Sequence, residues 1–98
     1  MPTPFEIATA QRDTLETMLN DAIGALRALT DDLAGDTPRV MGLTPDHVKA
    51  DPEWRAAKNK ADALFQSLRT FNGFYVRQFK RELAIARRAA RGPNIIDT

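Results

Sequence analysis

The sequence predicts an all-α protein: an antiparallel hairpin of two long helices that pairs with a second copy as a four-helix-bundle homodimer. Apolar residues recur at heptad spacing over two long segments, as they do in coiled coils. A stretch rich in glycine and proline separates the two segments. A band of aromatic residues in the second segment also exceeds what one pair of helices can bury. We expect residues 1–98 to form a single domain, with 92–98 as a flexible C-terminal tail.

The first long helix is expected over about residues 4–34. Thr3, followed by Pro4 and Glu6, has the pattern of a capping box with proline at the first helical position. Gly35 ends the helix, because glycine readily adopts the left-handed backbone that follows a last helical turn. The apolar seam of this helix advances in alternating steps of four and three residues: Leu15, Leu19, Ala22, Leu26, Leu29 and Leu33.

Residues 35–51 form the connection between the helices. Glycines and prolines interrupt any long helix here, and Thr44-Pro45-Asp46 predicts a single helical turn that extends to Lys49. Several residues of the connection are apolar, so we expect it to fold back over the end of the helix pair. These residues are Val40, Met41, Leu43 and Val48.

The second long helix is expected over about residues 52–91. Asp51 is a good N-cap, and Pro52 and Glu53 suit the first turn. Asn72-Gly73 is a turn signal within this range. The aromatic period continues through it and favours an unbroken helix, with a break at Asn72-Gly73 as the alternative. The seam contains Trp54, Ala57, Ala61, Leu64, Leu68, Phe71 and Tyr75, followed by two steps of four to Phe79 and Leu83. Such a stutter locally unwinds a supercoil.

The connection predicts that the two helices are antiparallel neighbours. The residue numbers of opposing positions should then sum to about 85, which places Leu15 opposite Phe71 and Phe5 near Phe79. In this register the second helix continues about ten residues past the start of the first, so that 81–91 projects beyond the hairpin.

The aromatic residues of the second helix are the candidate interface for oligomer formation and partner binding. One hairpin does not offer enough apolar surface to cover them all, whereas a second copy would. The expected partners are therefore the protein itself and a further protein. The candidate interface residues are Phe65, Phe71, Phe74, Tyr75 and Phe79.

Charge is distributed unevenly along the chain, although its net value is only +1. Residues 1–36 carry a balance of −5 and residues 37–98 a balance of +6. The basic residues of 77–91 are candidates for contact with nucleic acid or an acidic partner: Arg77, Lys80, Arg81, Arg87, Arg88 and Arg91. These basic residues are expected to spread around one continuous helix. Within 77–91, Gln78 is the only side chain suited to reading a base edge, so any nucleic-acid binding would be non-specific. The alternative explanation for this uneven charge is that the acidic first helix and the basic second helix neutralise each other within the hairpin.

The residues needed for catalysis or metal binding are scarce. Cysteine is absent, and His47 is the only histidine, with Asp51 four residues on. The acidic cluster Asp31, Asp32 and Asp36 lacks the alternating acids of a calcium loop. We therefore expect no catalytic residue, no metal and no cofactor, and a non-enzymatic adaptor or assembly module as the function.

The sequence contains no stretch of 18 apolar residues, so we expect no membrane partner. Its first residues lack the basic and apolar regions of a secretory signal. Cytoplasmic residence is the expectation.

Overall fold

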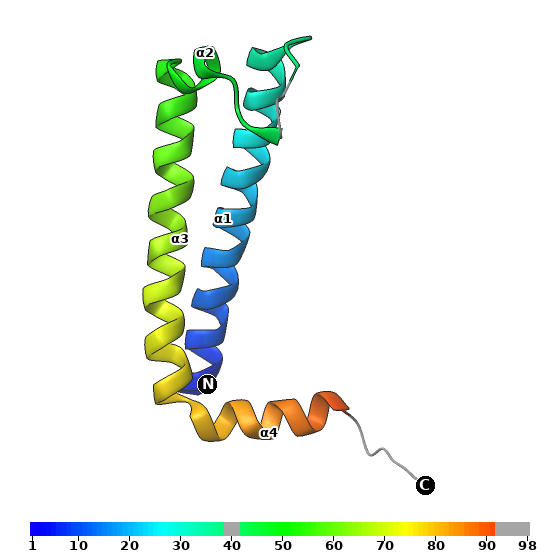
Figure 1. The fold of residues 1–98 in the computed structure, drawn as a ribbon. Coiled ribbons are helices and arrows are strands. Elements are labelled where there is room, and N and C mark those ends of the chain that lie inside the picture. The colour runs from blue at the N-terminus through cyan, green and yellow to red at the C-terminus, as the bar shows by residue number, and fades with distance from the viewer. Residues whose placement is uncertain (39–41, 92–98) are drawn as a thin grey trace, which may run out of the picture.

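The computed structural model describes residues 1–38 and 42–91, which form four helices and no strand. They are α1 (Pro4–Ala34), α2 (Asp46–Lys49), α3 (Pro52–Gln78) and α4 (Lys80–Arg91). Helices α1 and α3 run antiparallel side by side, α2 lies at the end where they are connected, and α4 crosses the opposite end (Figure 1). The all-α helical hairpin predicted from the sequence is confirmed. The tail 92–98, together with 39–41, lies outside the described residues.

Helix α1 begins and ends where its capping residues predict. The Thr3 amide donates to Glu6 Oε1 at 2.9 Å, and the Glu6 amide donates to Thr3 Oγ1 at 3.1 Å, which completes the capping box. At the other end Gly35 has φ +53°, a value that side chains disfavour, and its amide donates to Asp31 O at 3.0 Å. Local chemistry therefore sets both ends of this helix.

The capping box gives α1 a dependence on pH. The hydrogen bond from the Thr3 amide lowers the pKa of Glu6 below its ordinary value of 4.5. Because the folded pKa is lowered, the stabilisation is present above pH 4.5 and is lost as the pH falls through the folded value. An NMR titration should show Glu6 titrating below 4.5. In Thr3→Pro, which lacks both the amide hydrogen and the hydroxyl of Thr3, the Glu6 pKa should return toward its ordinary value; an unchanged low pKa would contradict Thr3 as its cause.

The connection folds against the hairpin through one helical turn, as predicted. Val48 in α2 is fully buried, whereas Leu43 stays exposed. His47 Nε2 lies 3.0 Å from the carbonyl oxygen of Leu33 and so ties the turn to the last residues of α1. Asp51 caps α3 by accepting from the amides of residues 53 and 54. The predicted contribution of Val40 and Met41 lies outside the described residues.

Two hydrogen bonds between helices show the register of the hairpin. Trp54 Nε1 donates to Thr30 Oγ1 at 2.8 Å near the connected end, and the hydroxyls of Thr9 and Tyr75 lie 2.7 Å apart near the open end. Both pairs of residue numbers sum to 84, in agreement with the predicted register. The antiparallel pairing is therefore continuous along the hairpin.

The helical hairpin has a core of mostly small residues. Eight hydrophobic residues are buried among those described, and four of them are alanines. Alanine allows two helices to lie close together, but its burial removes little apolar surface from water. The remaining four are Leu19, Val48, Tyr75 and Phe79. Several large apolar side chains consequently stay exposed on the helices: Ile7, Met18, Phe65, Phe74, Val76 and Ile85.

The expectation of one unbroken helix over 52–91 is wrong at Phe79. The backbone of Phe79 leaves the helical region, with φ −118° and ψ 31°, and separates α3 from α4. This is the position of the stutter, where two consecutive steps of four displace the apolar seam around the helix. The Phe79 ring is buried and lies 5.5 Å from that of Phe5.

Packing explains the direction that α4 takes after this break. A straight helix would carry Leu83 past Pro4, the first residue of α1, and away from the buried cluster. The turn at Phe79 instead places Leu83 against the buried cluster of Ala8, Tyr75 and Phe79. Helix α4 therefore crosses the end of the hairpin (Figure 1) and does not extend its axis, which corrects the expected projection of 81–91.

Helix α3 is continuous through Asn72-Gly73, as the aromatic period favours. A Cβ added at Gly73 would meet no atom within 4 Å, and the same holds for Gly24 in α1. Gly73→Ala and Gly24→Ala should each raise the free energy of unfolding by about 0.5–1 kcal/mol, because alanine restricts the unfolded chain more than glycine does. Chemical denaturation measures both. Destabilisation by Gly73→Ala alone would show that another backbone lies against Gly73 in the assembled protein.

Candidate interaction surface

An aromatic cluster fills the open end of the hairpin. The Phe5 ring lies 5.9 Å from that of Tyr75, and the Phe71 ring lies 6.0 Å from the same tyrosine. Phe74 meets Phe79 edge-on at 6.3 Å. Tyr75 and Phe79 are 2% and 7% exposed, so these two candidate interface residues are buried within one protomer.

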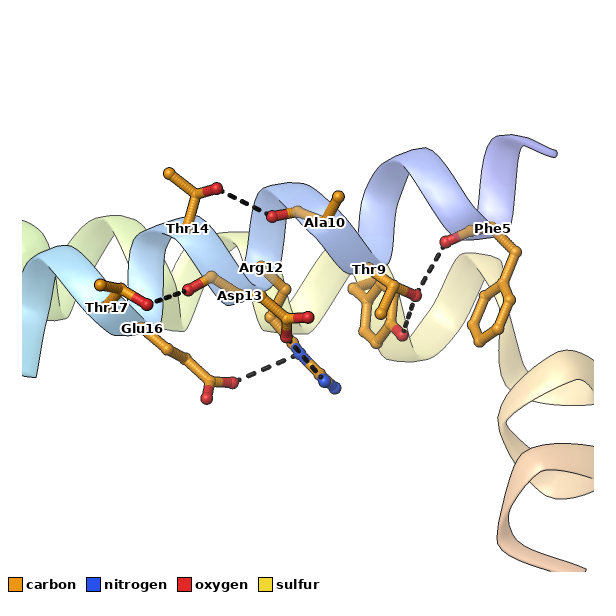
Figure 2. Close-up of polar contacts among 9 residues, drawn as sticks. Phe5, Thr9, Ala10, Arg12, Asp13, Thr14, Glu16 and Thr17 are labelled. Carbon is orange, nitrogen blue, oxygen red and sulfur yellow. Dashed lines mark hydrogen bonds and ion pairs between the residues drawn. The ribbon is translucent and has the colours of Figure 1, made fainter. Parts of the chain in front are cut away.

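Tyr75 is held by polar groups as well as by rings. Thr9 donates its only hydroxyl hydrogen to Phe5 O at 2.8 Å (Figure 2), so in the contact between Thr9 and Tyr75 the tyrosine must be the donor. The Arg12 guanidinium carbon lies 5.1 Å from the centre of the Tyr75 ring, within the range of a cation–π contact. Sequence reasoning missed the contact of Thr9, since polar residues on a heptad helix usually face solvent. The heptad frame, continued backwards from Leu15, does place Arg12 on the seam, but it does not show the contact of Arg12 with the Tyr75 ring.

Arg12 also makes the adjoining surface of α1 charged. Its Nη2 donates to Asp13 Oδ1 at 3.2 Å, and its Nε lies 3.3 Å from Glu16 Oε1 (Figure 2). The second contact is an ion pair without hydrogen-bond geometry, which leaves the buried Nε with no hydrogen-bond acceptor. One guanidinium therefore lies beside two carboxylates on this side of the hairpin.

The two exposed candidate phenylalanines lie on opposite sides of α3. Phe65 and Phe74 are 52% and 48% exposed, and nine residues separate them, which is about two and a half helical turns. We call the side of the hairpin with Ile7, Leu15, Met18, Leu64, Phe71 and Phe74 the Phe74 face. The opposite side, with Arg12, Glu16, Phe65, Arg69 and Val76, is the Phe65 face. The aromatic band of the sequence therefore divides among the core and two separate surfaces.

The Phe74 face has the larger apolar grooves. One groove of about 710 Å³ is bordered by Ile7, Leu15 and Phe71, and a second of about 560 Å³ is bordered by Phe74. The two grooves share Leu15 and Phe71, so they are continuous along the hairpin. On the Phe65 face, the groove beside Phe65 has a volume of about 320 Å³ and includes Arg69.

The break at Phe79 separates Arg77 from the other candidate basic residues. Arg77 stays in α3, where its Nε donates to Gly73 O at 3.1 Å. The described basic side chains of α4 are all exposed and fall within about 120° of the helix circumference, at 100° per residue. They are Lys80, Arg81, Arg87 and Arg88. In place of the expected spread, α4 presents one basic side; the Arg91 side chain is outside the described set.

Within residues 1–38 and 42–91, no three histidine, aspartate or glutamate side chains gather closely enough to hold a metal ion. The two candidate ligands around α2 have structural contacts, since His47 lies against the Leu33 carbonyl and Asp51 caps α3. No nucleophile with an adjacent base occurs among the contacts described above.

No protein-family model, curated protein or solved structure matches this chain. None of the helices in the described part of the chain combines the length and apolar character needed to cross a membrane.

Proposed function

We propose that the protein is a non-enzymatic helical interaction module of the cytoplasm, which self-associates as a four-helix-bundle homodimer and binds a macromolecular partner. The observation that carries this proposal is the exposure of large apolar side chains along both faces of the hairpin. Phe65 and Phe74 are each about half exposed. Single exposed apolar residues are ordinary, but here they border grooves that a partner would fill.

The small core supports self-association. The buried alanines bring α1 and α3 together without covering the aromatic and aliphatic side chains beside them. A second hairpin laid on the first would bury these side chains, as in four-helix bundles.

Sedimentation equilibrium at micromolar concentration tests the assembly. The expected mass is twice that of the 10.9 kDa chain, whereas a stable, folded monomer would contradict the homodimer. Pull-down from the native cell, with and without nuclease, tests partner binding and classifies the partner. Catalytic turnover that disappears on substitution of His47, or of Asp31 and Asp32, would contradict the non-enzymatic role.

Non-specific nucleic-acid binding through α4 is the second candidate. The observation that favours it is the basic side formed by Lys80, Arg81, Arg87 and Arg88 on the helix that crosses the open end of the hairpin (Figure 1). Affinity for single- or double-stranded nucleic acid should then fall steeply between 50 and 200 mM salt. Arg81→Gln with Arg88→Gln should weaken binding, whereas the hairpin control Arg55→Gln should not. Equal effects of both variants, or binding that ignores salt, would contradict this role for α4.

A further inference from the structure

We infer that two copies pair through the Phe74 face about a two-fold axis parallel to the hairpin. In this arrangement α1 of one copy lies over α3 of the other, and Asp21 of each copy faces Lys60 of the other. The inference rests on the proposed self-association and specifies its geometry. It leaves the Phe65 face and α4 free for a different partner.

Charge and groove size select the Phe74 face as the one covered by a second copy. The centres of homodimer interfaces are apolar and poor in charged residues. The continuous grooves beside Leu15, Phe71 and Phe74 meet this requirement. The Phe65 face carries Arg12, whose guanidinium already pairs with Asp13 and Glu16. Covering that face would remove this group of paired charges from water.

The orientation follows from the charges of the two helices. In a two-fold interface the same patch occurs on both copies, so two stacked hairpins place α1 either over α1 or over α3 of the partner. Helix α1 carries a net charge of −4 and α3 a net charge of +3. Stacking α1 over α1 opposes like charges, which disfavours that pairing. Stacking α1 over α3, about an axis parallel to the helices, opposes helices of unlike net charge.

One groove of the Phe74 face supplies a specific pair for this contact. A groove of about 370 Å³ lies between Met18 and Leu64, with Asp21 on the α1 side and Lys60 on the α3 side. Both charged residues are exposed, and neither forms an ion pair with another described residue. Asp21 and Lys60 lie at about the same level of the hairpin. A two-fold axis parallel to the helices therefore places Asp21 of each copy opposite Lys60 of the other, which gives two identical contacts.

Charge reversal and mixing test this geometry. Asp21→Lys and Lys60→Asp should each raise the dimer dissociation constant roughly tenfold, because two symmetric contacts become repulsive. An equimolar mixture of the two variants should form heterodimers in preference to either homodimer. In the mixed pair both contacts between copies are again attractive, although within each copy the two side chains remain alike. Native mass spectrometry of one isotope-labelled variant measures the distribution, and thermal unfolding verifies that both variants fold.

The outcomes separate the geometry from the proposed function. Preferential heterodimers together with weakened homodimers support the parallel two-fold arrangement. Unchanged homodimers, or a statistical mixture, would overturn it while leaving self-association intact. A wild-type protein that stays monomeric at high micromolar concentration would overturn the homodimer itself.

Discussion

Phe74→Asp is expected to dissociate the homodimer, whereas Phe65→Asp leaves it assembled. The two phenylalanines are matched in helix, chemistry and exposure, but only Phe74 lies on the face that we assign to the second copy. An unpaired carboxylate buried in an interface costs about 3–5 kcal/mol, which corresponds to a rise in the dissociation constant of more than a hundredfold. Sedimentation velocity over a range of concentrations measures both variants.

The folded state of Phe74→Asp needs its own control, since Phe74 also touches Phe71 and Phe79 within the protomer. Circular dichroism should show a helical monomer that melts at a lower temperature than wild type. Dissociation by Phe65→Asp with a stable Phe74→Asp dimer would assign the interface to the opposite face. Loss of dimer in both variants would indicate that the assembly covers both sides of α3.

The ends of the helices could be predicted from the sequence because local chemistry sets them. The Thr3–Glu6 capping box, the Asp51 cap and the positive φ of Gly35 each involve residues within one helical turn. The antiparallel register was also predictable, because the connection brings the end of the first heptad seam near the start of the second. Hydrogen bonds at both ends of the hairpin agree with that alignment.

The break at Phe79 is a feature that the heptad pattern of the sequence is not sufficient to predict. The stutter at this residue indicates unwinding, but a local unwinding and a full change of direction have the same spacing in the sequence. The direction depends on tertiary packing, since Leu83 reaches the aromatic cluster only if the chain turns. The basic side of α4 follows from the helical period alone, because Lys80, Arg81, Arg87 and Arg88 keep the same angular spacing in a bent or an unbroken helix. What depends on the turn is the direction in which that side points.

The division of the aromatic band among the core and two surfaces could not be predicted either, because it also depends on tertiary packing. Heptad spacing shows that Phe65, Phe71, Phe74, Tyr75 and Phe79 lie on a broad apolar surface. It does not show how much of that surface a single neighbouring helix covers. In the structure α1 covers Tyr75 and Phe79 and leaves Phe65 and Phe74 on opposite sides. The same five residues therefore serve the core and two surfaces.

The buried tyrosine is expected to be the most important side chain for stability. Tyr75→Ala should lower the free energy of unfolding by about 3–5 kcal/mol, because it removes a large ring that packs against Phe5, Phe71 and Phe79. A domain of this size is stable by about 5–15 kcal/mol, so the variant should be close to unfolding. Chemical denaturation at one fixed concentration measures the change. A loss below about 1 kcal/mol would contradict the central place of this ring.

The hydroxyl of Tyr75 should contribute less to the free energy of unfolding than the ring does. Substitution of its partner Thr9 tests whether this contribution comes from the hydrogen bond between the two residues. Tyr75→Phe should cost about 1 kcal/mol, since Thr9 keeps its bond to the Phe5 carbonyl. Thr9→Val should cost more, because it leaves the buried tyrosine hydroxyl without its acceptor. In the double variant the second substitution should add little to the loss caused by the first. The loss of the double variant minus the sum of the two single losses measures the coupling between the two hydroxyls. Additive losses would show that the bond between Thr9 and Tyr75 does not stabilise the hairpin.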